Sequence, residues 1–322
     1  MDEKLKNNLF HLGILLILLL VMLVTLIFTG ILGCNVIPGG CEVYYTVLKG
    51  GQPEILIAYG EGGLGNHVEL EKVFNDRDIL NAKVRSMEIS KLSYGNITDY
   101  DLIIVEEAKQ ICSTQLRLFE YYVNTGGRLV WTGDAGTELC SGNVEGERYA
   151  EYDSLLLESQ TDDGGLEKPI GPWARNDNGK QFRFDEILGV NYKGNYCEFG
   201  NCESDELKGW IEITNDEHKL TYGLSPTIPF KGEFAVVKLK STSNTRMVAT
   251  LDHGSNLIGE AEGKPWLEEG TKHNFGKLLP FIVSSQVGER VAYYASPLEE
   301  FVKGEEKYKA IIEQMYYGML YN

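Results

Sequence analysis

The sequence predicts an α/β fold, with a mainly parallel, flavodoxin-like sheet flanked by helices and preceded by one N-terminal transmembrane helix. Strand-like apolar runs and helix-like patterns follow one another closely from residue 54 onward. A long run without charged residues comes before them. We therefore assign residues 1–33 to a membrane anchor, 34–52 to a linker, and 53–322 to one α/β domain with a loop insertion at about 135–180.

The uncharged run extends from Leu12 to Gly33. As a helix it is long enough to cross the roughly 30 Å hydrocarbon core of a bilayer. Lys4 and Lys6 precede it and weakly favour an N-terminus on the inner side, although Asp2 and Glu3 offset them. We expect a single-pass protein of the cell membrane, with its domain on the extracytoplasmic side.

Two alternatives to an uncleaved anchor stay open. A cleaved secretory signal has an apolar core of about 7–15 residues, which is shorter than this run. The stretch Ile31–Cys34 also resembles a bacterial lipobox, which would place a lipid on Cys34.

All six cysteines follow the apolar run, and an even number of exported cysteines indicates disulfides. The close pairs Cys34/Cys41 and Cys197/Cys202 can each close a small loop, which leaves the other two for each other. Unpaired buried thiols are the alternative. A zinc site is disfavoured because no C-x-x-C pair or His-x-x-x-His group accompanies the cysteines. The six are Cys34, Cys41, Cys112, Cys140, Cys197 and Cys202.

The net charge of −17 argues against a nucleic-acid partner, because phosphate binding requires clustered Lys and Arg. We predict a membrane contact through the N-terminal helix, together with an envelope protein or carbohydrate as a further partner.

The first strand is expected at Ile55–Tyr59, and Asn66 is positioned to cap the helix after it, with Glu69 completing a capping box. A second helix opens at Ser113 or Thr114, and glycines end it. Further strands are expected at Lys83–Ile89, Leu102–Val105 and Arg128–Thr132.

The polar stretch from Ala135 to Lys180 predicts the loop insertion, with one possible helix around Tyr152–Leu157. The chain then becomes rich in strands. An amphipathic helix at Glu305–Tyr321 is expected to pack on the sheet. The predicted strands are Trp210–Ile213, Phe234–Leu239, Arg246–Leu251, Phe281–Ser284 and Arg290–Ala295.

The loop after the first strand reads Gly60-x-Gly62-x-x-Gly65, which matches a dinucleotide-binding fingerprint in its local context. The expected exported location and the absence of a convincing ribose-binding acid argue against that interpretation. We predict that no cofactor binds and that the glycines serve a tight strand-to-helix turn, where positive φ costs Gly little.

Five stretches in order resemble the class I glutamine amidotransferase-like superfamily, and within it the trehalose-utilisation-type branch. They cover roughly residues 54–320, apart from the insertion. They read ILIAYGEGGLGNHVELEKVF, DYDLIIVEE, FEYYVNTGGRLVWTGDAG, DEHKLTYGL and LPFIVSSQVGERVAYYAS.

The resemblance implies a catalytic Cys after the strand at Arg128–Thr132, and this sequence lacks it. The turn reads Thr132-Gly-Asp-Ala-Gly136, and Cys140 comes too late. The family's His-x-Glu pair is also missing after His218, His253 and His273. Since a thiolate–imidazole mechanism needs both groups, glutamine hydrolysis is not expected.

Ligands of open α/β sheets bind beyond the carboxyl ends of the strands. Those ends carry Glu61, His67, Glu107 and Asp134, which we take as candidate binding residues for a metal, a sugar or acid–base chemistry. The alternative is that they are solvated loop residues. The sequence favours a non-catalytic domain that binds a ligand or a protein partner, as an accessory of an envelope complex would, over an extracytoplasmic hydrolase of carbohydrate or peptide.

Overall fold

The computed structural model divides the chain into two compact units, Pro53–Leu320 and Met1–Gln52 with Tyr321–Asn322. In the smaller unit, helix α1 extends over Glu3–Phe28. Across the part of the chain that is described, no helix has the combination of length and apolar character that a membrane span requires. The structure describes residues 3–28, 51–76, 80, 82–140, 147–151, 169–177, 179–200, 202, 206–240, 244–260, 262–301 and 309–321.

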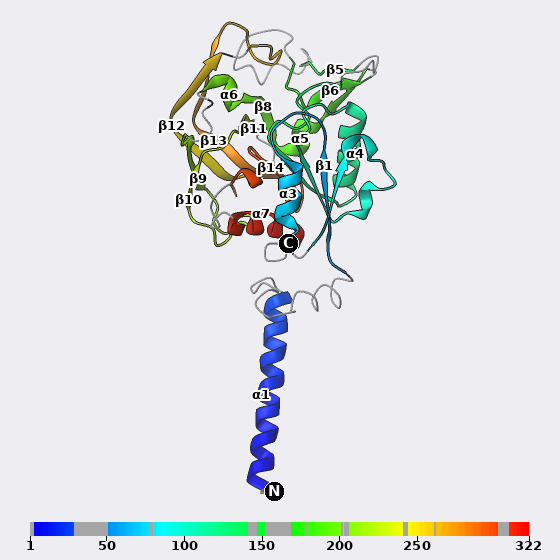
Figure 1. The fold of residues 1–322 in the computed structure, drawn as a ribbon, viewed down its shortest axis with the longest axis vertical. Coiled ribbons are helices and arrows are strands. Elements are labelled where there is room, and N and C mark those ends of the chain that lie inside the picture. Colours follow the sequence, from blue (N-terminus) through cyan, green and yellow to red (C-terminus); the bar gives the residue numbers. More distant parts are fainter. Residues whose placement is uncertain are drawn as a thin grey trace. The chain divides into compact units, whose positions relative to one another are not determined.

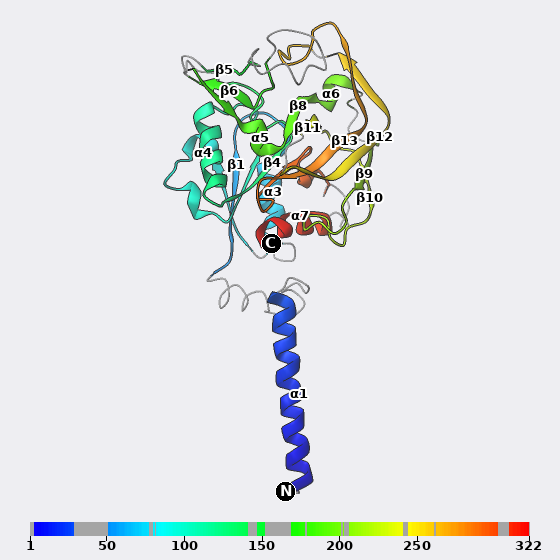
Figure 2. The same cartoon turned by 180° about the vertical axis from the view of Figure 1, so that it is seen from behind.

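The larger unit is built on a nine-stranded sheet with the order β10-β9-β12-β13-β14-β4-β3-β1-β2 (Figures 1 and 2). Its strands are β1 (Glu54–Tyr59), β2 (Lys83–Glu88), β3 (Leu102–Glu106), β4 (Arg128–Thr132), β9 (Gly209–Ile213), β10 (Thr227–Phe230), β12 (Arg246–Glu260), β13 (Lys272–Ser285) and β14 (Val291–Tyr294).

Five of these strands, β2-β1-β3-β4-β14, pair in parallel and form what we call the parallel half. Every residue of β3 and β14 is buried, as are the four central residues of β1. Such continuous apolar runs are typical of strands covered on both faces. The predicted α/β fold with its parallel sheet is therefore confirmed over these strands.

Helices cover both faces of the parallel half. The ring of Trp131 in β4 packs against Phe119 of α4 and Phe184 of α5, with centroids 5.5 and 4.8 Å apart. Tyr293 of β14 is the register partner of Trp131, so Tyr294 points to the opposite face. The helices of this unit are α3 (His67–Phe74), α4 (Ser113–Asn124), α5 (Phe184–Leu188), α6 (Tyr196–Phe199) and α7 (Lys309–Tyr321), with 3₁₀ turns at Ile89–Lys91, Ile97–Asp99 and Leu298–Phe301.

On that opposite face Tyr294 meets Tyr316 of α7, with ring centroids 5.9 Å apart. Phe74 of α3 contacts the same Tyr316 ring at 4.7 Å. The C-terminal helix thus packs on the sheet, as its amphipathic pattern predicts.

The other four strands, β10-β9-β12-β13, are antiparallel and form the antiparallel half. The sequence predicts strands at β9, β12 and β13 but not this change of direction. The hairpin of β12 and β13 also runs beyond the predicted strand ends at Leu251 and Phe281, up to Glu260 and from Lys272. Its outer part is largely exposed and lacks the apolar run on which the prediction rests.

The predicted loop insertion contains strands in its described part. β5 (Arg148–Tyr149), β6 (Ala174–Asp177) and β7 (Lys180–Arg183) form a small antiparallel sheet. Arg175 is fully buried and donates hydrogen bonds to the carbonyls of Pro172, Gly136 and Glu138. A second small sheet pairs β8 (Val190–Asn195) with β11 (Ala235–Leu239). The helix expected at Tyr152–Leu157 lies outside the described residues.

The described residues contain two disulfides, Cys112–Cys140 and Cys197–Cys202, with Cα–Cα distances of 5.1 and 4.8 Å. Both agree with the pairing inferred from the sequence. Cys34 and Cys41 lie outside the described residues.

Candidate functional site

The glycine loop, residues 60–66, connects the carboxyl end of β1 to α3. Gly62, Gly63 and Gly65 have positive φ values of 67°, 97° and 115°, which other residues adopt only at a cost. The Asn66 side chain accepts a hydrogen bond from the backbone N–H of Glu69 and so caps α3, as predicted. The predicted capping box does not form, because the Asn66 N–H donates to Glu299 and not to Glu69. The backbone conformation of the turn therefore accounts for these glycines, and their presence does not require a bound nucleotide.

The glycine loop packs against the segment that follows β3. The Glu107 N–H donates to the Leu64 carbonyl at 2.9 Å, and the Lys109 N–H donates to Gly62 at 3.1 Å. A Cβ on Gly65 would lie 3.4 Å from a carboxyl oxygen of Glu106. Glu61 is exposed on the outside of this loop.

Asp134 follows β4 and is buried rather than placed on an open rim, with 1% of its surface exposed. One carboxylate oxygen accepts from the Leu64 N–H at 2.7 Å, and the other accepts from the Asn195 side chain at 2.8 Å. The Lys109 Nζ lies 4.0 Å away. Asp134 thus joins three segments together, and both of its oxygens already have donors.

His67 and Glu107 form a contact at the carboxyl ends of β1 and β3. The His67 Nδ1 lies 2.7 Å from the Glu107 Oε2, which also accepts the His67 N–H. The imidazole stacks on Tyr59 with ring centroids 3.7 Å apart. Glu107 has φ 49°, a conformation that is uncommon for residues other than Gly and is found preferentially at functional sites.

An acidic pair, Glu106 and Glu299, lies beneath the glycine loop. Glu106 at the end of β3 is fully buried, and Glu299 beyond β14 is 3% exposed. Burial, reinforced by the negative charge of Glu299, holds the pKa of Glu106 well above its usual range. Glu299 accepts from the Asn66 N–H at 2.9 Å, so this pair supports the loop from below. The nearby Tyr316 hydroxyl is also buried.

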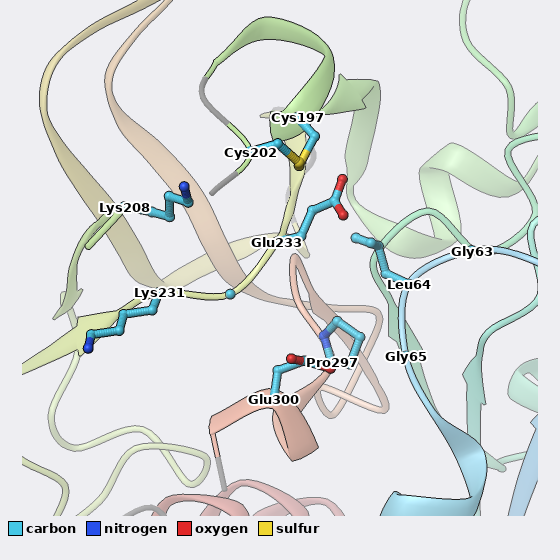
Figure 3. Close-up of a pocket in the computed structure, with 11 residues that line it drawn as sticks. Gly63, Leu64, Gly65, Cys197, Cys202, Lys208, Lys231, Glu233, Pro297 and Glu300 are labelled. Atoms are coloured by element: carbon cyan, nitrogen blue, oxygen red, sulfur yellow. A yellow bond between two sulfur atoms is a disulfide. The ribbon is translucent and has the colours of Figure 1, made fainter. Parts of the chain in front are cut away.

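A pocket of about 270 Å³ lies on the other side of the glycine loop (Figure 3). The backbone of the loop forms one wall, and the disulfide Cys197–Cys202 forms another. Charged side chains provide most of the rest. The lining residues are Gly63, Leu64, Gly65, Cys197, Cys202, Lys208, Lys231, Gly232, Glu233, Pro297 and Glu300. The four predicted binding residues are not among them.

The pocket contains both signs of charge. Lys208, just before β9, is 4% exposed, and its Nζ lies 5.4 Å from the ring centroid of Tyr196. Lys231 follows β10 and is exposed. Glu233 is half-buried, and burial together with the charges of Asp134 and other acids raises its pKa.

Sequence reasoning missed these four charged residues. Glu300 lies in the 3₁₀ turn Leu298–Phe301, beyond the end of the predicted strand Arg290–Ala295, so the rule that placed Glu107 at a strand end does not mark it. Lys208, Lys231 and Glu233 lie in connections of the antiparallel half, where the sequence carries no motif that marks them.

No protein-family model matches this chain, and no curated protein matches it. Solved structures with a similar fold include a ThuA-like protein from Bacteroides uniformis, at 16% identity over 81% of this chain and 89% of that chain, with a TM-score of 0.48. A glutamine amidotransferase from Thermotoga maritima is 9% identical over 84% of this chain and 99% of the other, with a TM-score of 0.45. A β-galactosidase from Rahnella sp. R3 is 13% identical over 83% of this chain, with a TM-score of 0.49, and this chain spans only 31% of that enzyme.

Proposed function

We propose that this chain is a membrane-anchored, extracytoplasmic binding protein whose amidotransferase-like domain is non-catalytic and holds a small zwitterionic ligand. The observation that carries the proposal is the pocket, whose lining includes two lysines and two glutamates. The uncharged run Leu12–Gly33 supports the anchor, and the two disulfides are consistent with an exported domain.

The size and lining of the pocket favour an amino-acid-like ligand. Drug-sized molecules occupy sites of about 300–1,000 Å³, so about 270 Å³ suits a smaller molecule. Lys208 and Lys231 would attract its carboxylate, while Glu233 and Glu300 would attract its ammonium group. Among the described residues that line the pocket none is aromatic, so it offers a neutral sugar no stacking surface.

The proposed lack of amidotransferase chemistry is supported by the turn after β4, in which the resemblance places Gly133 or Asp134 at the position of the family's nucleophile. Asp134 carries a carboxylate there and not a thiol. Its oxygens bind the Leu64 N–H and the Asn195 amide, so it closes the site instead of reacting. The resemblance supports the fold, and the substitution supports a binding role.

Calorimetry on the full chain in detergent tests the proposal, with glycine and L-glutamate as probes and glucose as the neutral comparison. We expect the amino acids to bind and glucose not to bind. Glu233→Gln should weaken binding about tenfold or more, since a hydrogen bond to a charged group is lost. The matched control Glu269→Gln, an exposed carboxylate outside the pocket, should leave affinity unchanged. Equal binding by Glu233→Gln, or binding of glucose alone, would contradict the proposal.

A second candidate, an extracytoplasmic hydrolase of carbohydrate or peptide, is favoured by one observation. Glu107 combines an unusual backbone conformation with a 2.7 Å contact to His67, as an orienting carboxylate does for a general base. Release of product from chromogenic glycosides or peptides, abolished by His67→Asn but not by Glu61→Gln, would establish this function in place of the first.

A further inference from the structure

The disulfide in the pocket wall lies beside a carboxylate. The sulfur atoms of Cys197 and Cys202 and a carboxylate oxygen of Glu233 all lie within 4.8 Å of one another. Figure 3 shows the Glu233 side chain directed toward the disulfide. Cys202 is exposed and Cys197 is partly exposed, so a reductant has access to this bond.

These three groups form a ligand set for zinc once the disulfide is reduced. Two thiolates and one carboxylate are ordinary Zn²⁺ ligands, and Cys197 and Cys202 have the C-x₄-C spacing found in zinc sites. Three protein ligands would leave a fourth position for water or a small molecule, as in zinc sites that remain open.

The electrostatic surroundings also favour a cation. The Glu233 carboxylate experiences the negative charges of Asp134, Glu198 and Glu300 and the positive charge of Lys109. Lys208 lines the same pocket, and a neighbouring ammonium group stabilises a thiolate, which is the form that binds metal.

We propose that reduction of the Cys197–Cys202 disulfide creates a Zn²⁺ site formed by Cys197, Cys202 and Glu233 in the wall of the pocket. A dithiol reductant supplies two electrons and two protons, which convert the disulfide into two thiols, and is itself oxidised to a disulfide. Zn²⁺ then displaces the two thiol protons. Under oxidising conditions the disulfide is retained and the metal site does not form.

The proposal makes the pocket bifunctional and rests in part on the proposed function, because Glu233 would serve the ligand's ammonium group in one state and the metal in the other. Zinc in the reduced protein is therefore expected to compete with glycine. The two proposals fail separately, since amino-acid binding is measured on the oxidised protein and zinc binding on the reduced protein.

Metal titration of the full chain in detergent tests the site. The protein is reduced with a phosphine, freed of reductant under anaerobic conditions and titrated with Zn²⁺ against a chromophoric chelator. Co²⁺ is used in parallel, because thiolate-to-cobalt charge transfer reports sulfur ligation. We expect a background variant that lacks the other four cysteines, Cys34→Ser/Cys41→Ser/Cys112→Ser/Cys140→Ser, to bind one Zn²⁺ after reduction and none before it.

Two variants in that background identify the ligands. Adding Cys197→Ser/Cys202→Ser should abolish the thiolate-to-cobalt band. Glu233→Gln should keep the band but lower Zn²⁺ affinity about tenfold or more, because one charged ligand is lost. If the serine variant is misfolded by near-ultraviolet circular dichroism, Glu233→Gln decides the question. Unchanged zinc affinity in Glu233→Gln, or zinc binding equal in oxidised and reduced protein, would overturn the proposal.

Discussion

The two halves of the sheet differ in what they contribute to the site. In the parallel half the inner strands β1, β3, β4 and β14 are buried on both faces, and polar groups such as Asp134 are fixed by hydrogen bonds. The antiparallel half has partly exposed strands, and the connections at its ends supply Lys208, Lys231 and Glu233 to the pocket.

This difference shows that the backbone wall of the pocket and most of its charged side chains come from different parts of the fold. The glycine loop and its supports belong to the parallel half, which positions one pocket wall rigidly. Three of the groups that would recognise a ligand, Lys208, Lys231 and Glu233, come from segments that lie between β4 and β14 in the sequence, and Glu300 follows β14. Changes in the parallel half should therefore mainly affect stability, and changes in the pocket lining should mainly affect binding.

The largest expected effect is the loss of Asp134. Asp134→Ala would leave the Leu64 N–H and the Asn195 amide buried without their acceptor, and we expect it to lower the free energy of unfolding by about 3–5 kcal/mol. Urea denaturation followed by tryptophan fluorescence measures this value. Glu61→Ala, at an exposed carboxylate that was also predicted to bind, should change it by less than about 0.5 kcal/mol. Similar effects for the two variants would show that Asp134 is not a structural residue.

The two disulfides should differ in the stability they provide. Cys112–Cys140 joins the connections after β3 and β4 and closes a loop with a sequence separation of 28, whereas Cys197–Cys202 has a separation of 5. Loop-closure entropy then predicts a loss of about 4 kcal/mol for Cys112→Ala/Cys140→Ala and of about 2 kcal/mol for Cys197→Ala/Cys202→Ala. The same denaturation experiment checks the order. A larger loss of stability on removing Cys197–Cys202 would show that this disulfide stabilises the fold by more than loop-closure entropy.

The smallest expected effect concerns pH. Burial, with the charge of Glu299, raises the pKa of Glu106, so the folded state retains a proton that the unfolded chain releases. Stability from this group is complete below the unfolded pKa and is lost as pH rises toward the folded pKa. Unfolding midpoints measured from about pH 5 to about pH 8 should therefore fall with pH, and Glu106→Gln should reduce this slope.

Asp185 provides the opposite case, in α5. Burial acts to raise its pKa, but hydrogen bonding to Arg183 and the charge of Lys240 outweigh it, and the pKa lies below the usual 3.8. Its contribution is present above that value and is lost as pH falls through the lowered folded pKa. Asp185→Asn should therefore weaken the acid side of the stability profile and leave the alkaline slope unchanged. A change on the alkaline side would contradict these assignments.

The inner strands of the parallel half were predictable because they are short apolar runs with clear turn residues around them. Ile55–Tyr59 and Arg128–Thr132 match β1 and β4 within one residue. Strand β6 was not predictable in the same way, since Ala174–Asp177 includes Arg, Asn and Asp. Arg175 is buried there because backbone carbonyls from distant segments satisfy it, and local sequence carries no sign of them.

The candidate site was predictable only in part for a related reason. The strand-end rule placed His67 and Glu107 at one edge, and the structure brings them into contact. The rule could not show that Asp134 is enclosed, because its donors lie on a loop before it and on β8 after it. The positions of Lys208 and Lys231 in the pocket depend on how the antiparallel strands pair. That pairing joins residues far apart in the sequence, so local sequence does not reveal it.

The position of β14 has a consequence for how the chain folds. Its Val291 pairs with Leu129 of β4, although the antiparallel half and both small sheets lie between them in the sequence. Contacts of such high sequence separation form late and slow the search for the native topology. During synthesis β4 must therefore leave one edge unpaired until Val291–Tyr294 has emerged. A chain interrupted before that point would expose the apolar edge of β4, which is a template for aggregation.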